Sequence, residues 1–213
     1  MHPTAGEAVA AAQPPLDPEC EKLVAALRKR CPDAFPKGPL KPGQPAPPVP
    51  LPVETAQALY NATFAAAAGP PQARAAGGVV WTQSDAELLV RLSKIRVRLL
   101  DGLVLVGVPV FCEQTQGVEI VVAFAVGAKD APAGMVIATE SAPRGPAVIV
   151  DRWGDALTAA AHQALIALAQ SIAGAAGQDV DGVPLLPAAL EASPDGLQIL
   201  PQARHAFDRR ANA

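Results

Sequence analysis

Four basic residues within eight positions are the side chains best placed to do chemistry: Arg91, Lys94, Arg96 and Arg98. On a strand, Lys94, Arg96 and Arg98 would share one face. Three cations side by side repel one another unless an anion or an acidic partner lies over them. The pattern first indicates an edge strand that charge protects from aggregation. The functional alternative is a contact for an anionic ligand, a nucleic-acid phosphate or an acidic protein segment, with these four residues as the candidate site.

Composition makes nucleic acid the least favoured of these ligands. The 213-residue chain carries 17 Lys+Arg against 20 Asp+Glu, which gives a formal net charge of -3. A nearly neutral chain is not built to neutralise a long phosphate backbone. The basic segment also has no aromatic side chain on which a base could stack.

Cysteine and histidine offer a second possible chemistry, centred on Cys112 and His162. Cys112 ends an apolar segment beside Glu113, whose charge we expect to raise the pKa of the thiol. A nucleophilic cysteine needs the opposite setting and a base, and His162 could approach only through the fold. Both residues are therefore predicted to be inert. A small-molecule pocket between sheet and helix, lined by the two, remains as an alternative function.

Motifs for metals, cofactors and common catalytic mechanisms are absent. The chain contains no nucleophile elbow, no phosphate-binding glycine loop and no pair of cysteines or histidines at metal-ligand spacing. Residues 179–182 open like a calcium loop but lack its later ligands, so they predict a turn. Glu113 and Glu119 flank a predicted hairpin turn, where solvated carboxylates are common. We expect no metal, no cofactor and no catalysis.

The elements that would position these residues begin after a proline-rich arm. Thirteen of the 23 prolines lie in residues 1–52, so residues 1–51 are predicted to be a flexible, disordered arm. Within it, Cys20, Val24, Leu27 and Cys31 predict a short amphipathic helix over residues 18–31. Such a helix either docks on the main domain or awaits a partner. Val24 and Leu27 are its predicted partner-binding residues.

The folded domain is predicted to span residues 52–177 and to be α+β. Apolar spacing indicates a helix over residues 52–69, and a capping box at Ser84 predicts a second one. Five strands follow, joined by connections too short for crossover helices, at residues 95–99, 103–112, 118–127, 135–140 and 147–151. A long helix over residues 155–173 completes an antiparallel five-stranded meander flanked by two N-terminal helices and one long C-terminal helix.

The central strands are so apolar that both of their faces need cover. Between Asp101 and Lys129 the only charged residues are Glu113 and Glu119. The helices can cover one face of the sheet. The other needs the tail, residues 178–213, in which residues 197–200 can add an edge strand, or a second copy of the chain. Pro109 predicts a bulge, or pairing on one side only, in the second strand.

These observations favour a non-catalytic protein–protein interaction module: an adaptor, a chaperone or an assembly subunit that forms homo-oligomers. A small-molecule-binding domain or enzyme is the alternative, and an anion or nucleic-acid binder is the third possibility. We expect a cytoplasmic location because no export signal is apparent. Residues 156–178 are apolar but rich in alanine, so they predict a buried helix and no membrane contact.

Overall fold

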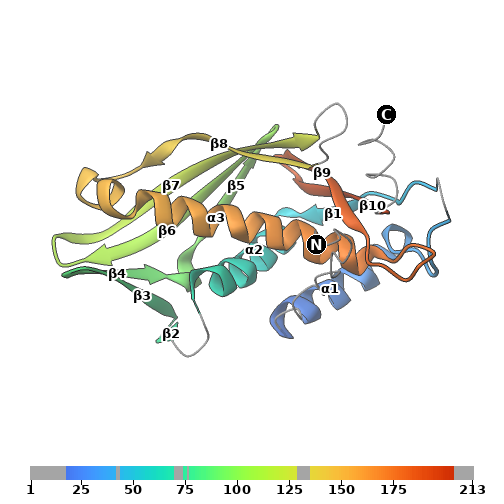
Figure 1. Cartoon of the computed structure of the whole chain (residues 1–213), viewed down its shortest axis with the longest axis horizontal. Helices are drawn as coiled ribbons and strands as arrows, with labels where there is room; N and C mark the ends of the chain where they lie inside the picture. Colours follow the sequence, from blue (N-terminus) through green and yellow to red (C-terminus); the bar gives the residue numbers. More distant parts are fainter. Residues whose placement is uncertain (1–17, 42–43, 70–73, 76, 129–134, 204–213) are drawn as a thin grey trace, which may run out of the picture.

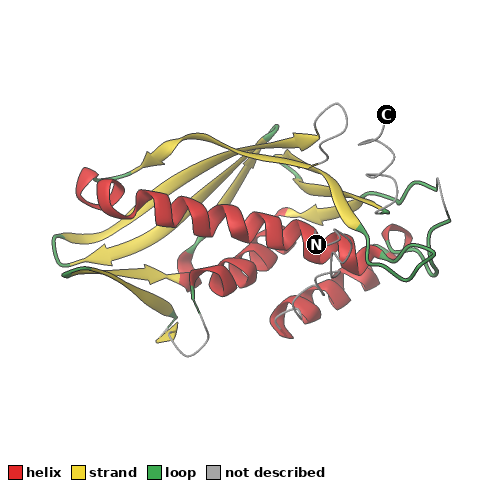
Figure 2. Ribbon diagram, viewed as in Figure 1, coloured by secondary structure: helices red, strands yellow, loops and turns green. Residues whose placement is uncertain are grey.

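The computed structural model of the chain describes residues 18–41, 44–69, 74–75, 77–128 and 135–203. This part of the chain folds into three α-helices and two antiparallel sheets (Figures 1 and 2). The helices are α1 (Pro18–Arg30), α2 (Val53–Ala68) and α3 (Ala147–Ala176). The predicted α+β class, with antiparallel pairing and a long C-terminal helix, is confirmed.

The larger sheet has the strand order β2-β3-β4-β6-β7-β8, and β5 also pairs with β6. Its strands are β2 (Arg74–Ala75), β3 (Gly78–Gln83), β4 (Ala86–Arg91), β5 (Arg96–Leu100), β6 (Leu103–Cys112), β7 (Thr115–Ala128) and β8 (Met135–Arg144). The smaller sheet has the order β1-β10-β9, formed by β1 (Val49–Pro52), β9 (Leu186–Ser193) and β10 (Gly196–Gln202).

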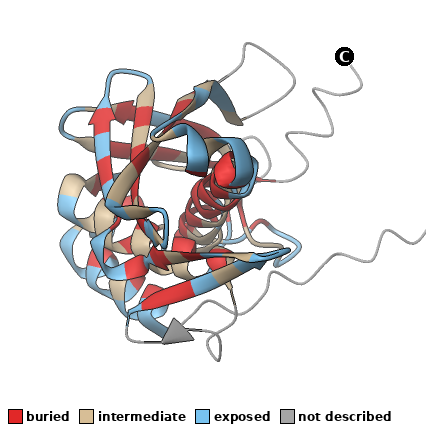
Figure 3. Cartoon of the chain, turned by 90° about the vertical axis from the view of Figure 1, so that its left-hand side faces the viewer, coloured by how far each residue is buried: buried red, intermediate tan, exposed pale blue. Residues whose placement is uncertain are grey.

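The core lies on one face of the larger sheet, which we call the inner face. Helices α2 and α3 both cross this side, and the smaller sheet packs on them there (Figure 1). In β6 the inner residues are fully or almost fully buried: Val104, Val106, Val108 and Val110. Seen end-on, α3 runs between the strands with most of its turns buried (Figure 3). Among the described residues, α3 is also the one helix long and apolar enough to span a membrane, and its apolar side is this buried core side.

Two segments have a different secondary structure from the one predicted. The predicted fifth strand, residues 147–151, is the first part of α3, because Ile149, Trp153 and Leu157 recur every four residues and are all buried. The helix predicted from Ser84 is instead strand β4. Ser84 has a φ of 55°, which belongs to a turn and not to a helix N-cap. Leu88 then pairs with Trp81 across the β3–β4 hairpin.

The strand count therefore differs from the prediction, although the central hairpin does not. Strand β6 has the predicted bounds, and the Asp101-Gly102 turn joins β5 to β6 with Gly102 at a φ of 68°. Residues 197–200 belong to β10, which is the middle strand of the smaller sheet and not an edge.

The described part of the predicted arm packs on the domain. Val24 and Leu27 of α1 are buried, and α1 contacts α2. Further along, Leu40 forms a bridge to Asp179, and β1 pairs with β10. Val24 and Leu27 therefore offer no exposed surface to a partner in this structure. Residues 1–17 and 42–43 of the arm lie outside the described residues.

Candidate functional site

The face of the larger sheet that points away from α2 and α3 is the candidate site, and we call it the outer face. Strand pairing assigns its residues, because partners in an antiparallel ladder share a face. Residues on β6 that alternate with the buried valines lie there: Leu103, Leu105, Gly107, Pro109 and Phe111. Within the described part of the chain, α2, α3 and the smaller sheet all pack from the inner side.

The basic residues gather in the middle of this face. Arg91, Lys94 and Arg96 line a depression of about 360 Å3, together with Pro109, Gly117 and Glu119. Arg98 lies one step further along β5, opposite Leu105, and outside the depression. Arg144 of β8 joins the same face through its pairing with Val121. None of the five forms an ion pair within the described part of the chain. We call these five cations the basic band.

The depression arises where β4 ends and β5 begins beside the same strand. Strand β4 pairs with Val110 and Phe111 of β6, whereas β5 pairs only with residues 103–107 of that strand. Val108 and Pro109 have no strand partner on that side, while Pro109 pairs with Glu119 on the other. One-sided pairing at Pro109 was expected and is confirmed, since proline has no N–H to donate. The 3-10 turn Leu92–Lys94 connects the end of β4 to the start of β5.

Glu119 is the acidic exception within the basic band. Its carboxylate lies over Gly107: a Cβ added there would be 2.7 Å from Glu119 Cδ. The absence of a side chain at Gly107 is therefore what lets the carboxylate lie flat on the sheet. Two further exposed carboxylates follow the outer residues of their strands, Glu87 on β4 and Glu140 on β8. The face still carries an excess of positive charge, because these three carboxylates stand against five cations.

Two exposed apolar patches flank the basic band on the outer face. The Phe111 patch consists of Val80, Leu89 and Phe111, which are aligned by pairing across three strands; Val80 is 47% exposed and Phe111 42%. The Leu100 patch consists of Leu100, Leu103, Ala125 and Ala138, aligned in the same way across four strands, and Leu100 is 46% exposed.

Cys112 lies elsewhere, in a second depression of about 420 Å3 between the β3–β4 hairpin, the β6–β7 turn and α3. Its Sγ is 3.3 Å from Thr115 Oγ1, and this hydrogen bond lowers the pKa of the thiol. The nearby Glu113 charge acts in the raising direction, as expected, but it is outweighed. At the same rim the guanidinium of Arg152 donates to Asp85 at 2.7 Å, which lowers the pKa of that exposed carboxyl.

His162 does not line this depression. Its Nε2 is 3.0 Å from the carbonyl oxygen of Ile137, so this nitrogen carries a proton and donates it. Its ring also packs against Phe124, with the centroids 5.8 Å apart. The structure thus separates the two residues that were considered together as a pocket lining.

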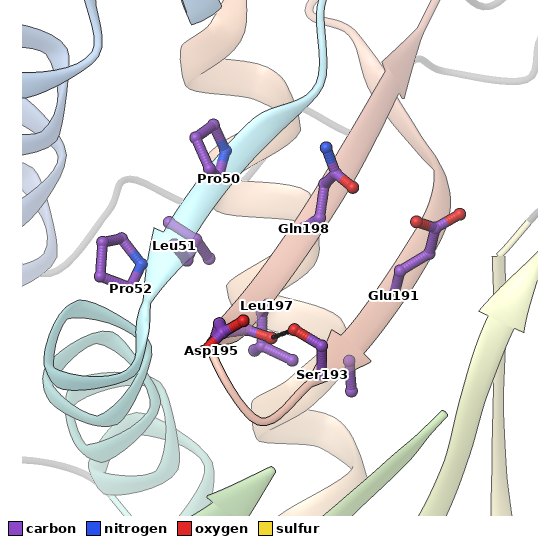
Figure 4. A pocket seen from close by; sticks show the side chains of 10 residues that line it. Pro50, Leu51, Pro52, Glu191, Ser193, Asp195, Leu197 and Gln198 are labelled. Carbon is purple, nitrogen blue, oxygen red and sulfur yellow. Dashed lines mark hydrogen bonds between the residues drawn. The ribbon is translucent and has the colours of Figure 1, made fainter. Parts of the chain in front are cut away.

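A third depression, of about 360 Å3, lies over the smaller sheet (Figure 4). Gln198 and the exposed Glu191 stand on one side of this sheet, while Leu51 and Leu197 point into the core. Residues 179–182, in the loop after α3, form the predicted turn. The Asp179 carboxylate accepts hydrogen bonds there from the backbone N–H groups of Asp181 and Val183. Among the described residues no group of three potential ligands could hold a metal ion.

No known protein-family model matches the chain, and no curated protein or solved structure matches it either.

Residues that sequence reasoning missed belong to the outer face. The alternation of β6 places Phe111 in step with Leu103 and Leu105, so its membership could have been found from period two alone. Val80 and Leu89 are missed because the capping box at Ser84 predicts a helix. Leu89 then has no sheet face, and Val80 has no partner strand. Glu119 could be found only from the pairing of β6 with β7.

Proposed function

We propose that the chain is a non-catalytic protein-interaction module whose outer face binds an acidic segment of a partner protein. The observation that carries this proposal is the basic band: five cations on one sheet face that have no ion pair within the described part of the chain. Clustered like charges raise the energy of the free protein, and an acidic ligand relieves that repulsion.

The electrostatic repulsion among the cations of the basic band indicates that they are more than a solvated surface. Arg96 and Arg98 lie two residues apart on one strand face, at about 7 Å. Arg91 and Lys94 approach them from the end of β4 and the turn that follows. Charge on the edge strand β5 would discourage aggregation, but that role accounts only for Arg96 and Arg98, because Arg91 and Lys94 lie outside β5. The depression between these cations also gives a carboxylate room to reach several of them.

The surroundings of the band favour a protein ligand over a nucleic acid. Apolar patches border it at both ends, and Phe111 supplies the one exposed phenylalanine or tryptophan of the described chain. Nucleic-acid sites instead surround their cations with further cations and several stacking aromatics. The net charge of -3 also repels a long polyanion at the rest of the surface.

A second copy of the chain fits this face less well. In a two-fold symmetric dimer a surface patch meets itself, so the basic band would face another outer face with the same excess of positive charge. An acidic partner has no such penalty. Self-association through other surfaces is compatible with this proposal.

Fluorescence anisotropy with two labelled peptides tests the proposal. One peptide has six consecutive glutamates between pairs of serines, and the other has six lysines in the same frame. We expect the glutamate peptide alone to bind, with affinity that falls steeply as salt rises. The double variant Arg96→Glu/Arg98→Glu should lose this binding. The matched control is Arg30→Glu/Lys37→Glu, which reverses two exposed cations outside the outer face and should keep it.

Three results would overturn the proposal. They are equal binding of the lysine peptide, unchanged binding by Arg96→Glu/Arg98→Glu, and a clear preference for single-stranded DNA of the same net charge. Light scattering on the same variants distinguishes a further case: a dimer that dissociates only in Arg96→Glu/Arg98→Glu would make a second copy the occupant of this face.

A further inference from the structure

We propose, as an extension that rests on the function above, that the partner segment has an acidic centre with one apolar anchor on each side. The juxtaposition that carries this inference is the order of surfaces along the outer face: the Phe111 patch, the basic band and the Leu100 patch.

Strand β6 sets the distance between the two apolar patches that the partner's anchors would contact. Phe111 and Leu103 are both outer residues of this strand and lie eight positions apart. At about 3.3 Å per residue, their Cα atoms are separated by roughly 26 Å. An extended peptide of about eight residues spans the same distance, whereas a helix would need about 17 residues at 1.5 Å each.

The centre of the face is low, which leaves the cations accessible. Between the two patches β6 contributes Leu105, Gly107 and Pro109. Leu105 lies opposite Arg98 and outside the depression, whereas Gly107 and Pro109 have no long side chain. The depression occupies this stretch, and Arg91, Lys94 and Arg96 stand around it. A partner that lies across the sheet can therefore lower its central carboxylates between the cations while its ends rest on the apolar patches.

The partner must lie across the face and not extend the sheet at β5. Gln57 of α2 already occupies the free edge of that strand: its side chain accepts from Val97 N–H at 2.7 Å and donates to the Ile95 carbonyl at 3.1 Å. Strand addition at this edge would have to displace the glutamine. Recognition by side chains on the face needs no such exchange.

The two apolar patches contain three of the large apolar residues that the described chain leaves exposed. Val80, Leu100 and Phe111 each expose between 42% and 47% of their surface. Burial of an apolar side chain of this size is the main source of affinity in small interfaces, whereas exposed ion pairs contribute selectivity and association rate. An acidic peptide with apolar ends should therefore bind much more tightly than an acidic peptide alone.

Peptide series and variants of the full chain test the anchors. Relative to the six-glutamate peptide with serine ends, a peptide with Phe-Leu pairs at both ends should bind roughly tenfold more tightly. Phe111→Ser and Leu100→Ser should each remove much of that gain, so that the difference in affinity between the two peptides becomes small in these variants. Val180→Ser is the matched control, because Val180 is 50% exposed in the loop after α3 and should change neither affinity.

The outcomes separate the two proposals. Equal affinity of the two peptides, both still sensitive to Arg96→Glu/Arg98→Glu, would overturn the anchors and leave the acidic site intact. If neither peptide binds, both proposals fail. A third peptide of the same composition, with only two glutamates between its apolar pairs, should lose most of the gain; full affinity would overturn the 26 Å spacing.

Discussion

At the scale of single residues, Glu119 is the clearest test of how the outer face discriminates. Its carboxylate lies among the cations and competes with any acidic ligand for them. Glu119→Gln keeps the shape of the side chain and removes its charge. We expect binding of the six-glutamate peptide to tighten about two- to fivefold, as for the loss of one repulsive surface charge.

Titration of the labelled peptide at low and high salt measures this effect. Glu113→Gln is the control, since Glu113 is an exposed carboxylate on the β6–β7 turn and does not line the basic depression. Weaker binding after Glu119→Gln would mean that the carboxylate organises the cations and does not oppose the ligand.

The thiol of Cys112 provides a second prediction at this scale. The hydroxyl of Thr115 lowers the thiol pKa, so Thr115→Val should raise it toward the ordinary value. Less thiolate is then present at a given pH, and the midpoint of alkylation by iodoacetamide should move to higher pH. Alkylation followed by mass spectrometry from pH 6 to 10 measures that midpoint at Cys112, separately from Cys20 and Cys31.

Thr139→Val serves as the control, because Thr139 is exposed on β8, away from this thiol. An unchanged midpoint in Thr115→Val would show that the backbone groups of Gln114 and Thr115 are sufficient to lower the pKa.

At the scale of elements, β5 depends on a side chain from α2. Gln57 satisfies an N–H and a carbonyl at the strand edge that no strand pairs. Gln57→Ala leaves both groups without this partner, and we expect the free energy of unfolding to fall by about 1–3 kcal/mol. Urea denaturation compares it with Gln170→Ala, an exposed position of α3 where the change should be within about 0.5 kcal/mol.

A loss at Gln57 no larger than that at Gln170 would mean that water caps the edge equally well. The same result would weaken the reason for placing the partner across the face, since the edge of β5 would then be open to strand addition.

The β4 segment shows why local pattern alone misled. Ser84-Asp85-Ala86-Glu87 matches a capping box, and the leucines that follow suit a helix as well as a strand. The structure adds contacts that lie outside this segment. Trp81 Nε1 donates to the carbonyl of Ala68 at the end of α2, and β4 pairs along β3 from Gln83 to Gly78. The local pattern contains neither contact.

At the scale of the whole molecule, the proline-rich segment before α2 is part of the fold. Leu51 of β1 is buried between the smaller sheet and the helices, although it lies in a stretch that alternates with proline. Leu51→Ala should lower the free energy of unfolding by about 2–5 kcal/mol because it leaves a cavity. Thermal denaturation measures the effect.

Leu100→Ala removes the same atoms from an exposed position and should change stability by less than about 1 kcal/mol. Comparable losses at the two positions would contradict the packing of β1 on the domain.

Periodicity along the sequence was enough to predict α1, α2 and the β5–β6 hairpin, together with most of α3. Each has an uninterrupted local pattern, and Asp101-Gly102 marks its turn chemically. The basic residues were likewise visible as a cluster, because four of them lie within eight positions. The apolar character of β6 and β7 also showed that both sheet faces require cover.

Only the tertiary structure decided which face receives that cover and what remains open. The described part of the tail, residues 178–203, forms β9 and β10 on the inner side, and within the described residues the outer face is left to Arg96, Phe111 and their neighbours. Glu119 and Arg144 reach that face through strand pairing alone. Pairing joins residues far apart in sequence, and its register depends on the packing of α2 and α3, which no local pattern records.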